Sequence, residues 1–108
     1  MENDIKEIME KLKTFNKERD WDQFHSPENL AKSISIESAE LLECFQWNNN
    51  FNEEDVEEEL ADVFTYCFML ADKLNVDPKT IILNKLKKTE KKYPIEKAKG
   101  KSTKYNKL

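Results

Sequence analysis

Glycine scarcity is the feature that most limits what this chain can fold into. Its 108 residues include a single glycine, Gly100, and three prolines. A sheet protein of this length needs many tight turns, and glycine supplies the unusual backbone conformations at many of them. A chain of this length forms one domain. With so little turn material, that domain is expected to be all-α.

The same scarcity excludes several kinds of binding site. The dinucleotide fingerprint GxGxxG and the phosphate loop GxxxxGKS/T need several glycines, which let the backbone approach a phosphate closely. With one His and two Cys, the chain cannot build a HExxH site, a paired Glu-x-x-His di-iron site or a four-cysteine zinc site. We therefore expect any bound metal ion to be held mainly by oxygen.

Charge is divided unevenly along the chain. The net charge is −4, but residues 1–72 carry 19 acidic and 6 basic side chains, whereas residues 73–108 carry 3 acidic and 12 basic ones. Between Lys32 and Lys73 there are eleven carboxylates and no Lys or Arg. The acidic part favours a cation, and the basic part suits the phosphates of a small ligand or of nucleic acid. Nucleic acid is disfavoured as a partner because the acidic part repels its phosphates.

Targeting signals and cysteine positions indicate the compartment. No apolar run approaches the roughly 18 residues that a membrane span needs, and the N-terminal sequence has no apolar segment typical of a signal peptide. We expect a cytoplasmic protein without membrane contact. Cys44 and Cys67 lie among apolar residues in expected helices, which predicts buried free thiols in a reducing compartment.

Apolar spacing and capping residues predict four helices. Ser26, Asn52 and Asp77 are N-cap candidates, and Asn3 is a possible cap of the first helix. Ser26 and Asp77 are each followed by proline, which suits the first helical turn. The expected helices cover about residues 4–18, 27–46, 53–74 and 78–92.

Four carboxylates at helical spacing form the candidate metal centre. Glu37 lies inside the apolar stripe of the second expected helix, with Glu40 on its flank. Glu59 and Asp62 line one edge of the third helix's stripe. A short loop makes the two helices antiparallel neighbours, so that the two acidic pairs can face each other. Oxygen ligands of this kind suit Mg²⁺, with Mn²⁺ as a chemical substitute.

Structural explanations stay open for some of these acids. A carboxylate in an apolar stripe must be paired, neutralised or bound to metal, so Glu37 has a structural alternative. The acids of residues 53–58 suit a solvated helix start that complements the helix dipole. Glu43 projects away from the stripe and is either a surface residue or an outer ligand.

The sequence contains two acidic motifs, and the segments that surround them are distinctive. The motifs are Glu37-Ser-Ala-Glu40 and Glu59-Leu-Ala-Asp62. The flanks are Arg19-Asp-Trp-Asp-Gln-Phe-His-Ser-Pro27, Phe45-Gln-Trp47, Lys92-Tyr-Pro94 and Lys104-Tyr105. From about residue 12 to residue 108, the chain resembles the MazG-like, all-α nucleoside triphosphate pyrophosphohydrolase superfamily, whose metal pattern is ExxE followed by ExxD. The flanks resemble its dCTP pyrophosphatase branch.

The resemblance implies a fold and an activity. The fold is a four-helix, bundle-like MazG fold that self-associates as a homodimer or homotetramer. Residues 1–94 would form the catalytic domain, and the basic tail of residues 95–108 would complete its site or be partly ordered. The activity is hydrolysis of a nucleoside triphosphate, dCTP or a modified dCTP, to the monophosphate and pyrophosphate, as nucleotide-pool housecleaning.

The resemblance also implies roles for particular residues. The four carboxylates Glu37, Glu40, Glu59 and Asp62 would coordinate Mg²⁺, and one of them would help to orient the attacking water.

Substrate contacts follow from the resemblance in the same way. Trp21 and Trp47 would enclose the base, Phe24 and His25 would shape its recognition, and Tyr66 would approach the sugar. Phosphate contacts are implied for Lys85, Lys88, Lys92, Lys104 and Tyr105. Without the resemblance, the tryptophans are expected in core or interface space, the histidine at the surface and most of the lysines on a solvated face.

The chain departs from the family pattern at three positions. Ile36 and Ala39 stand where the family often has Gly, and Thr89 stands where an Asn is common. These departures leave a non-catalytic, helical nucleotide-binding sensor as the alternative function.

Overall fold

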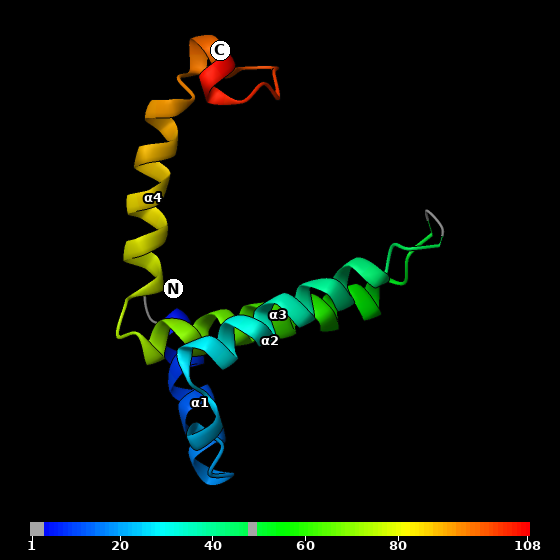
Figure 1. The fold of residues 1–108 in the computed structure, drawn as a ribbon, viewed down its shortest axis with the longest axis vertical. Helices are drawn as coiled ribbons and strands as arrows, with labels where there is room; N and C mark the ends of the chain where they lie inside the picture. The colour runs from blue at the N-terminus through cyan, green and yellow to red at the C-terminus, as the bar shows by residue number, and fades with distance from the viewer. Residues whose placement is uncertain (1–3, 48–49) are drawn as a thin grey trace. The chain divides into compact units, whose positions relative to one another are not determined.

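The computed structural model describes residues 4–47 and 50–108 (Figure 1). These residues form helices and connecting turns without any strand, which confirms the all-α prediction. None of the helices in the described part of the chain is long and apolar enough to cross a membrane. The chain divides into two compact units, Met1–Val76 and Asp77–Leu108.

The first unit contains three α-helices and one short 3₁₀ helix. The helices are α1 (Asp4–Glu18), η1 (Asp22–Phe24), α2 (Pro27–Glu43) and α3 (Glu53–Lys73). The prediction that α2 extends to Gln46 is wrong. The amides of residues 44–46 each donate to the carbonyl three residues earlier, at 3.0 to 3.2 Å, so the α-helix ends in tighter turns.

Side-chain caps start three of the helices, as predicted. Ser26, Asn52 and Asp77 each accept a hydrogen bond from the amide three residues later, at 3.2, 3.0 and 3.2 Å. Each bond satisfies one of the amides that a helix start leaves without an internal partner. The possible cap at Asn3 lies outside the described residues, as do two of the asparagines in the loop between α2 and α3.

Two helices end in a left-handed residue that is not glycine. Asp20 has φ 55° and follows α1, and Asn75 has φ 60° and follows α3. The amide of Asp20 donates to Lys17 O at 3.1 Å, and the next amide donates to Asn16 O at 2.9 Å. This pair of bonds is the Schellman motif, in which the left-handed position usually carries glycine. A chain with so little glycine therefore uses Asp and Asn, which tolerate this conformation best among the other residues.

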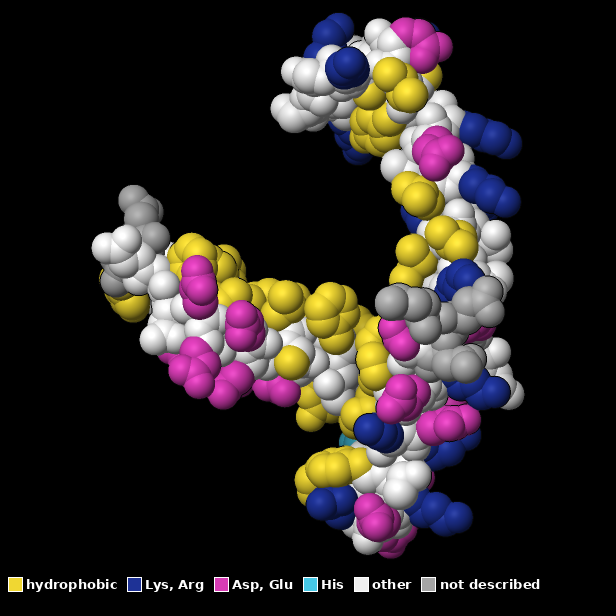
Figure 2. All heavy atoms as spheres, turned by 180° about the vertical axis from the view of Figure 1, so that it is seen from behind, with side chains coloured by type: hydrophobic (Ala, Val, Ile, Leu, Met, Phe, Trp, Pro, Cys, Tyr) yellow, Lys and Arg dark blue, Asp and Glu magenta, His cyan; other side chains and the backbone are white. Residues whose placement is uncertain are grey.

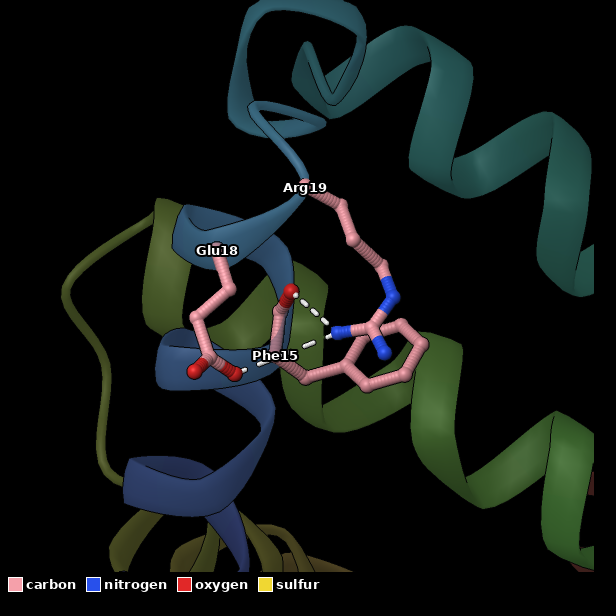
Figure 3. Close-up of polar contacts among 3 residues, drawn as sticks. All are labelled: Phe15, Glu18 and Arg19. Atoms are coloured by element: carbon pink, nitrogen blue, oxygen red, sulfur yellow. Dashed lines mark hydrogen bonds and ion pairs between the residues drawn. The ribbon is translucent and has the colours of Figure 1, made fainter.

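Arg19 fixes the end of α1 (Figure 3). Its Nη1 donates to Phe15 O at 3.1 Å and lies 4.0 Å from Glu18 Oε1. Its guanidinium stands 3.8 Å from the centroid of the Phe15 ring, which also meets the Trp21 ring edge to face at 5.5 Å. A basic side chain that binds a free carbonyl stabilises a helix end. These contacts define where the chain leaves α1.

The antiparallel pair of α2 and α3 forms the body of the first unit, and α1 packs against one end of it (Figure 1). Leu30 of α2 is completely buried, and Ala71 of α3 is buried beside the same end. Lys13 of α1 and Asp72 of α3 form an ion pair at 3.7 Å. The compact part of this unit therefore lies where the three helices meet.

Much of the apolar surface of α2 and α3 is exposed. Leu42 and Phe64 are 71% and 54% exposed. Figure 2 shows hydrophobic side chains gathered along one edge of the helix pair. Cys44 and Cys67 are free, as predicted, but the prediction that they are buried is wrong. Cys67 is exposed because it lies on the apolar stripe of α3, which this unit does not cover, and Cys44 is half-buried in the turn that ends α2.

The second unit consists of α4 (Pro78–Lys92), α5 (Ile95–Ala98) and η2 (Tyr105–Lys107). The Tyr93 hydroxyl accepts a hydrogen bond from the Tyr105 amide at 3.2 Å, and their rings meet edge to face at 6.1 Å. Lys92 Nζ stands 4.7 Å from the centroid of the Tyr105 ring. Residues 95–108 therefore fold back onto the end of α4, and they contain two short helical segments, α5 and η2, that were not expected from the sequence.

Candidate metal centre

Three glutamates meet on the facing sides of α2 and α3. Glu37 and Glu40 come from α2 and Glu59 comes from α3, and one carboxylate oxygen of each lies within 4.8 Å of the others. We refer to these three residues as the acidic cluster. Their spacing explains the arrangement, because side chains three residues apart share one face of a helix. Antiparallel packing then sets that face of α2 against Glu59.

Burial and crowding disfavour charge at Glu37. Its Oε2 is buried and has no hydrogen-bond partner among the described residues. Burial raises the pKa of Glu37 to about 7, together with a hydrogen bond to Glu40 and the charges of Glu40, Asp62 and Glu59. A carboxylic acid with this pKa is partly protonated at neutral pH. Every cause that acts on the pKa of Glu37 raises it, and none of them is a positive charge that would stabilise the ionised carboxylate.

Glu59 of α3 resembles Glu37 in its burial and in its raised pKa. Its Oε2 is also buried without a hydrogen-bond partner in the described part of the chain. Burial raises the pKa of Glu59, as do a hydrogen bond to Glu40 and the charges of Glu40, Asp62 and Glu58. Glu40 thus interacts with both neighbours and connects the two helices.

Asp62 is the fourth predicted ligand, one turn after Glu59 on α3. It is exposed and does not share the 4.8 Å spacing of the acidic cluster. Its negative charge nevertheless contributes to the raised pKa values of Glu37, Glu59 and Tyr66. Asp62 therefore lies at the border of the acidic cluster rather than among its three closest carboxylates.

The donor set fits a hard divalent cation. Two buried carboxylate oxygens lack a hydrogen-bond donor, and no basic side chain of residues 4–47 and 50–108 forms an ion pair with the acidic cluster. A divalent cation would supply the missing positive charge to both oxygens. Carboxylate oxygens from two helices are ligands that Mg²⁺ and Mn²⁺ accept, and no sulfur or imidazole donor belongs to the cluster.

Tyr66 and Cys44 lie close enough to the acidic residues for the carboxylate charges to raise their pKa values. Burial raises the pKa of the Tyr66 hydroxyl, and the charges of Glu37, Asp62 and Glu40 raise it further. Burial and the charge of Glu59 also raise the pKa of the Cys44 thiol, whose Sγ lies 3.6 Å from Glu40 O. Both groups therefore stay neutral. This position of Cys44 was predictable from the sequence, because its spacing of four residues from Glu40 places both on one helix face.

The predicted base-binding residues occupy two separate places in the first unit. The aromatic connector, residues 19–25, carries Trp21 and Phe24, which are 45% and 60% exposed, and the half-buried His25. Trp47 is 85% exposed and follows the opposite end of α2. Since α2 has 17 residues, these two ends are about 25 Å apart. One chain alone therefore does not bring Trp21 and Trp47 together around a base.

The predicted phosphate-binding residues all belong to the second unit. Lys85, Lys88 and Lys92 lie on α4, and their side chains are exposed. Lys104 and Tyr105 lie at the start of η2, and Tyr105 is in contact with Lys92. These residues give the second unit a positive surface, and none of the four lysines forms an ion pair with an acid of the described residues.

Comparison with known proteins places the chain in a family. The model of the MazG-like family matches residues 32–108. The chain is 36% identical over 104 residues to dCTP pyrophosphatase 1 of Homo sapiens, and 34% identical over 104 residues to that of Rattus norvegicus. Each match covers 87% of this chain and 61% of the relative, so the chain spans about three fifths of the length of these relatives.

A solved structure agrees with this assignment. A pyrophosphatase from Archaeoglobus fulgidus superposes with a TM-score of 0.75 at 43% sequence identity, covering 82% of this chain and 91% of that one. The fold, the family model and the relatives therefore agree, and the chain belongs to the MazG-like family.

Proposed function

We propose that this protein is a metal-dependent nucleoside triphosphate pyrophosphohydrolase. The reaction is hydrolysis between the α and β phosphates, which yields the nucleoside monophosphate and pyrophosphate. The observation that carries this proposal is the acidic cluster, whose two unpartnered buried oxygens suit a divalent cation. The relatives with known activity support dCTP or a modified dCTP as the substrate. The cellular role proposed for this activity is removal of dCTP or modified dCTP from the nucleotide pool.

Glu37, Glu40 and Glu59 would hold the metal ion, with Asp62 completing the set from the border of the cluster. Mg²⁺ is the proposed ion and Mn²⁺ its substitute. When bound, such an ion polarises a phosphoryl oxygen and lowers the pKa of a bound water. One carboxylate of the four orients the attacking water by accepting its hydrogen bond. Phosphates would be bound by Lys85, Lys88, Lys92, Lys104 and Tyr105, and Tyr66 would approach the sugar.

A homodimer or homotetramer is the proposed state of assembly. The exposed apolar residues of α2 and α3, such as Leu42 and Phe64, support it because contiguous apolar surface favours association. If Trp21 and Trp47 enclose one base, as proposed, their separation within one copy also calls for a second copy. A second copy can bring its Trp47 to the aromatic connector of the first, so that Trp21 and Trp47 enclose one base between copies.

Product analysis tests the proposed activity. The purified chain is incubated with each of the four dNTPs and MgCl₂, and pyrophosphate release is measured. We expect release to be fastest with dCTP, to stop when EDTA is added, and to be lost in Glu40→Gln with helicity unchanged. Glu57→Gln is the matched control, since Glu57 is an exposed acid outside the acidic cluster.

The alternative function predicts a different result in the same experiment. A non-catalytic nucleotide sensor would bind dCTP in calorimetry and release no pyrophosphate from any dNTP. Release of pyrophosphate that survives Glu40→Gln would contradict the assignment of the metal ligands.

A further inference from the structure

Two buried polar atoms outside the acidic cluster also lack a partner. Asn16 Oδ1 and His25 Nδ1 are inaccessible and make no hydrogen bond to any described residue. Asn16 lies in the last turn of α1 and is 4% exposed. His25 ends the aromatic connector. Buried polar atoms in folded proteins are nearly always paired, either with protein groups or with ordered water.

The two residues line one small cavity. It lies where α1, the connector and α3 meet, and its apolar walls include Leu30 and Phe68. Its volume is about 20 Å³. A single water molecule needs roughly 10–15 Å³ by this measure. The cavity therefore has room for one water and is too small for a nucleobase.

We propose that one buried water molecule occupies this cavity and bridges Asn16 to His25. The water donates one hydrogen to Asn16 Oδ1 and accepts a hydrogen bond from the Nδ1–H of His25. Asp22 also lines the cavity and offers a third polar group. Two to four polar partners are what a buried water requires. A bridge of this kind satisfies both unpartnered atoms without any change in the helices.

The bridge makes Asn16 a positioning residue for the aromatic connector. The Asn16 backbone carbonyl already accepts a hydrogen bond from the Trp21 amide at 2.9 Å, at the entry of the connector. At its exit, Asn29 Nδ2 donates to Phe24 O at 2.9 Å. The water joins entry to exit, so the segment that carries Trp21 and Phe24 is closed into a rigid loop. Any effect of Asn16 on nucleotide binding rests on the proposed function. The presence of the buried water and the rigidity of the aromatic connector do not depend on that function.

The first test uses the unmodified chain. His25 is the single histidine of the sequence, so its imidazole gives one unambiguous set of NMR signals. We expect cross-peaks from a long-lived water to the His25 ring and to the Asn16 side-chain amide. If both groups show only rapid exchange with bulk solvent, the bridging water is refuted. This measurement requires no variant to fold.

The second test is a double-mutant cycle with Asn16→Leu, His25→Phe and the double variant, followed by thermal unfolding. Each single variant leaves the other group buried without its bridge, so each lowers Tm by several degrees. The double variant is expected to lose no more than the larger single loss. Additive losses would contradict a shared water. Asn84→Leu is the matched control, because Asn84 is an exposed asparagine of the second unit.

A third measurement addresses the rigidity of the connector. In a Trp47→Phe background, the fluorescence of Trp21 reports the connector alone, since the chain has two tryptophans. Asn16→Leu is expected to increase quenching of Trp21 by acrylamide, and Asn84→Leu to leave it unchanged. Unchanged quenching in Asn16→Leu would overturn the positioning role. Because none of these readouts uses turnover, their outcome is independent of whether the chain hydrolyses dCTP.

Discussion

Glu37 of α2 and Glu59 of α3 place carboxylate oxygens within 4.8 Å of each other, and each keeps a buried oxygen without a hydrogen-bond donor among the described residues. Packing of the two helices thus brings two carboxyl groups together where no described basic side chain forms an ion pair with either of them. Such a pair reduces the stability of the metal-free protein. A divalent cation converts the same pair into a favourable contact, so stability and metal binding are coupled at this site.

The first prediction concerns pH. In the folded chain the pKa of Glu37 is about 7, against an ordinary value of 4.5, so between these values the folded state binds more protons than the unfolded state. The contribution of Glu37 to the free energy of unfolding therefore decreases as pH rises through this window. In thermal unfolding without metal, Glu37→Gln should be more stable than the unmodified chain at pH 7.5 and nearly equal to it at pH 4. An identical pH profile for both proteins would contradict the prediction.

The second prediction concerns metal binding. Glu37→Gln and Glu59→Gln each remove a charged oxygen from the acidic cluster, and each should weaken Mn²⁺ binding in calorimetry by at least about tenfold. Asp62→Asn should weaken it less, because Asp62 lies at the border of the cluster. An equal or larger loss in Asp62→Asn would mean that the metal sits closer to α3 than the acidic cluster indicates. Glu57→Gln serves as the control for a change in net charge.

The third prediction concerns the two helix ends that lack glycine. Asp20 and Asn75 adopt φ values of 55° and 60°. Glycine adopts this conformation without a steric penalty, so Asp20→Gly and Asn75→Gly should each raise the free energy of unfolding by about 0.5–1 kcal/mol. Urea unfolding measures this change. Substitution by alanine at the same positions is the opposite control and should destabilise the protein.

The fourth prediction concerns the division of the base-binding residues between copies. Trp21→Ala and Trp47→Ala should each reduce dCTP turnover. If the base lies between Trp21 of one copy and Trp47 of another, mixing and reassembling the two variants creates some sites with both tryptophans. For a homodimer, activity should recover to about a quarter of the original value. Activity that stays at the level of the single variants would place both residues in the same chain's site.

Much of the fold could be predicted because its signals are local. The caps at Ser26, Asn52 and Asp77 depend on residues within one turn, and the helix starts follow from them. The end of α2 was harder to predict. None of the residues 44–46 is a proline or glycine that would end a helix. The chain there forms turns with hydrogen bonds three residues apart instead of continuing the α-helix.

The candidate site was predictable to the extent that helix periodicity describes it. Spacing of three residues placed Glu37 and Glu40 on one face, and a short loop placed Glu59 opposite. The exposure of Cys67 was not predictable from spacing, because an apolar stripe does not say whether the same chain covers it. The burial of Asn16, in contrast, could have been predicted from the sequence. It continues the apolar spacing of α1 from Leu12, and a polar residue at such a position is the signal that reveals it.

The most direct test of the central claim is ³¹P NMR of dCTP incubated with the chain and MgCl₂. The proposed activity predicts that the dCTP signals are replaced by those of dCMP and pyrophosphate in equal amounts, and that Glu40→Gln produces neither. Formation of dCDP and orthophosphate, or dCTP that persists unchanged with the folded chain and Mg²⁺, would contradict it.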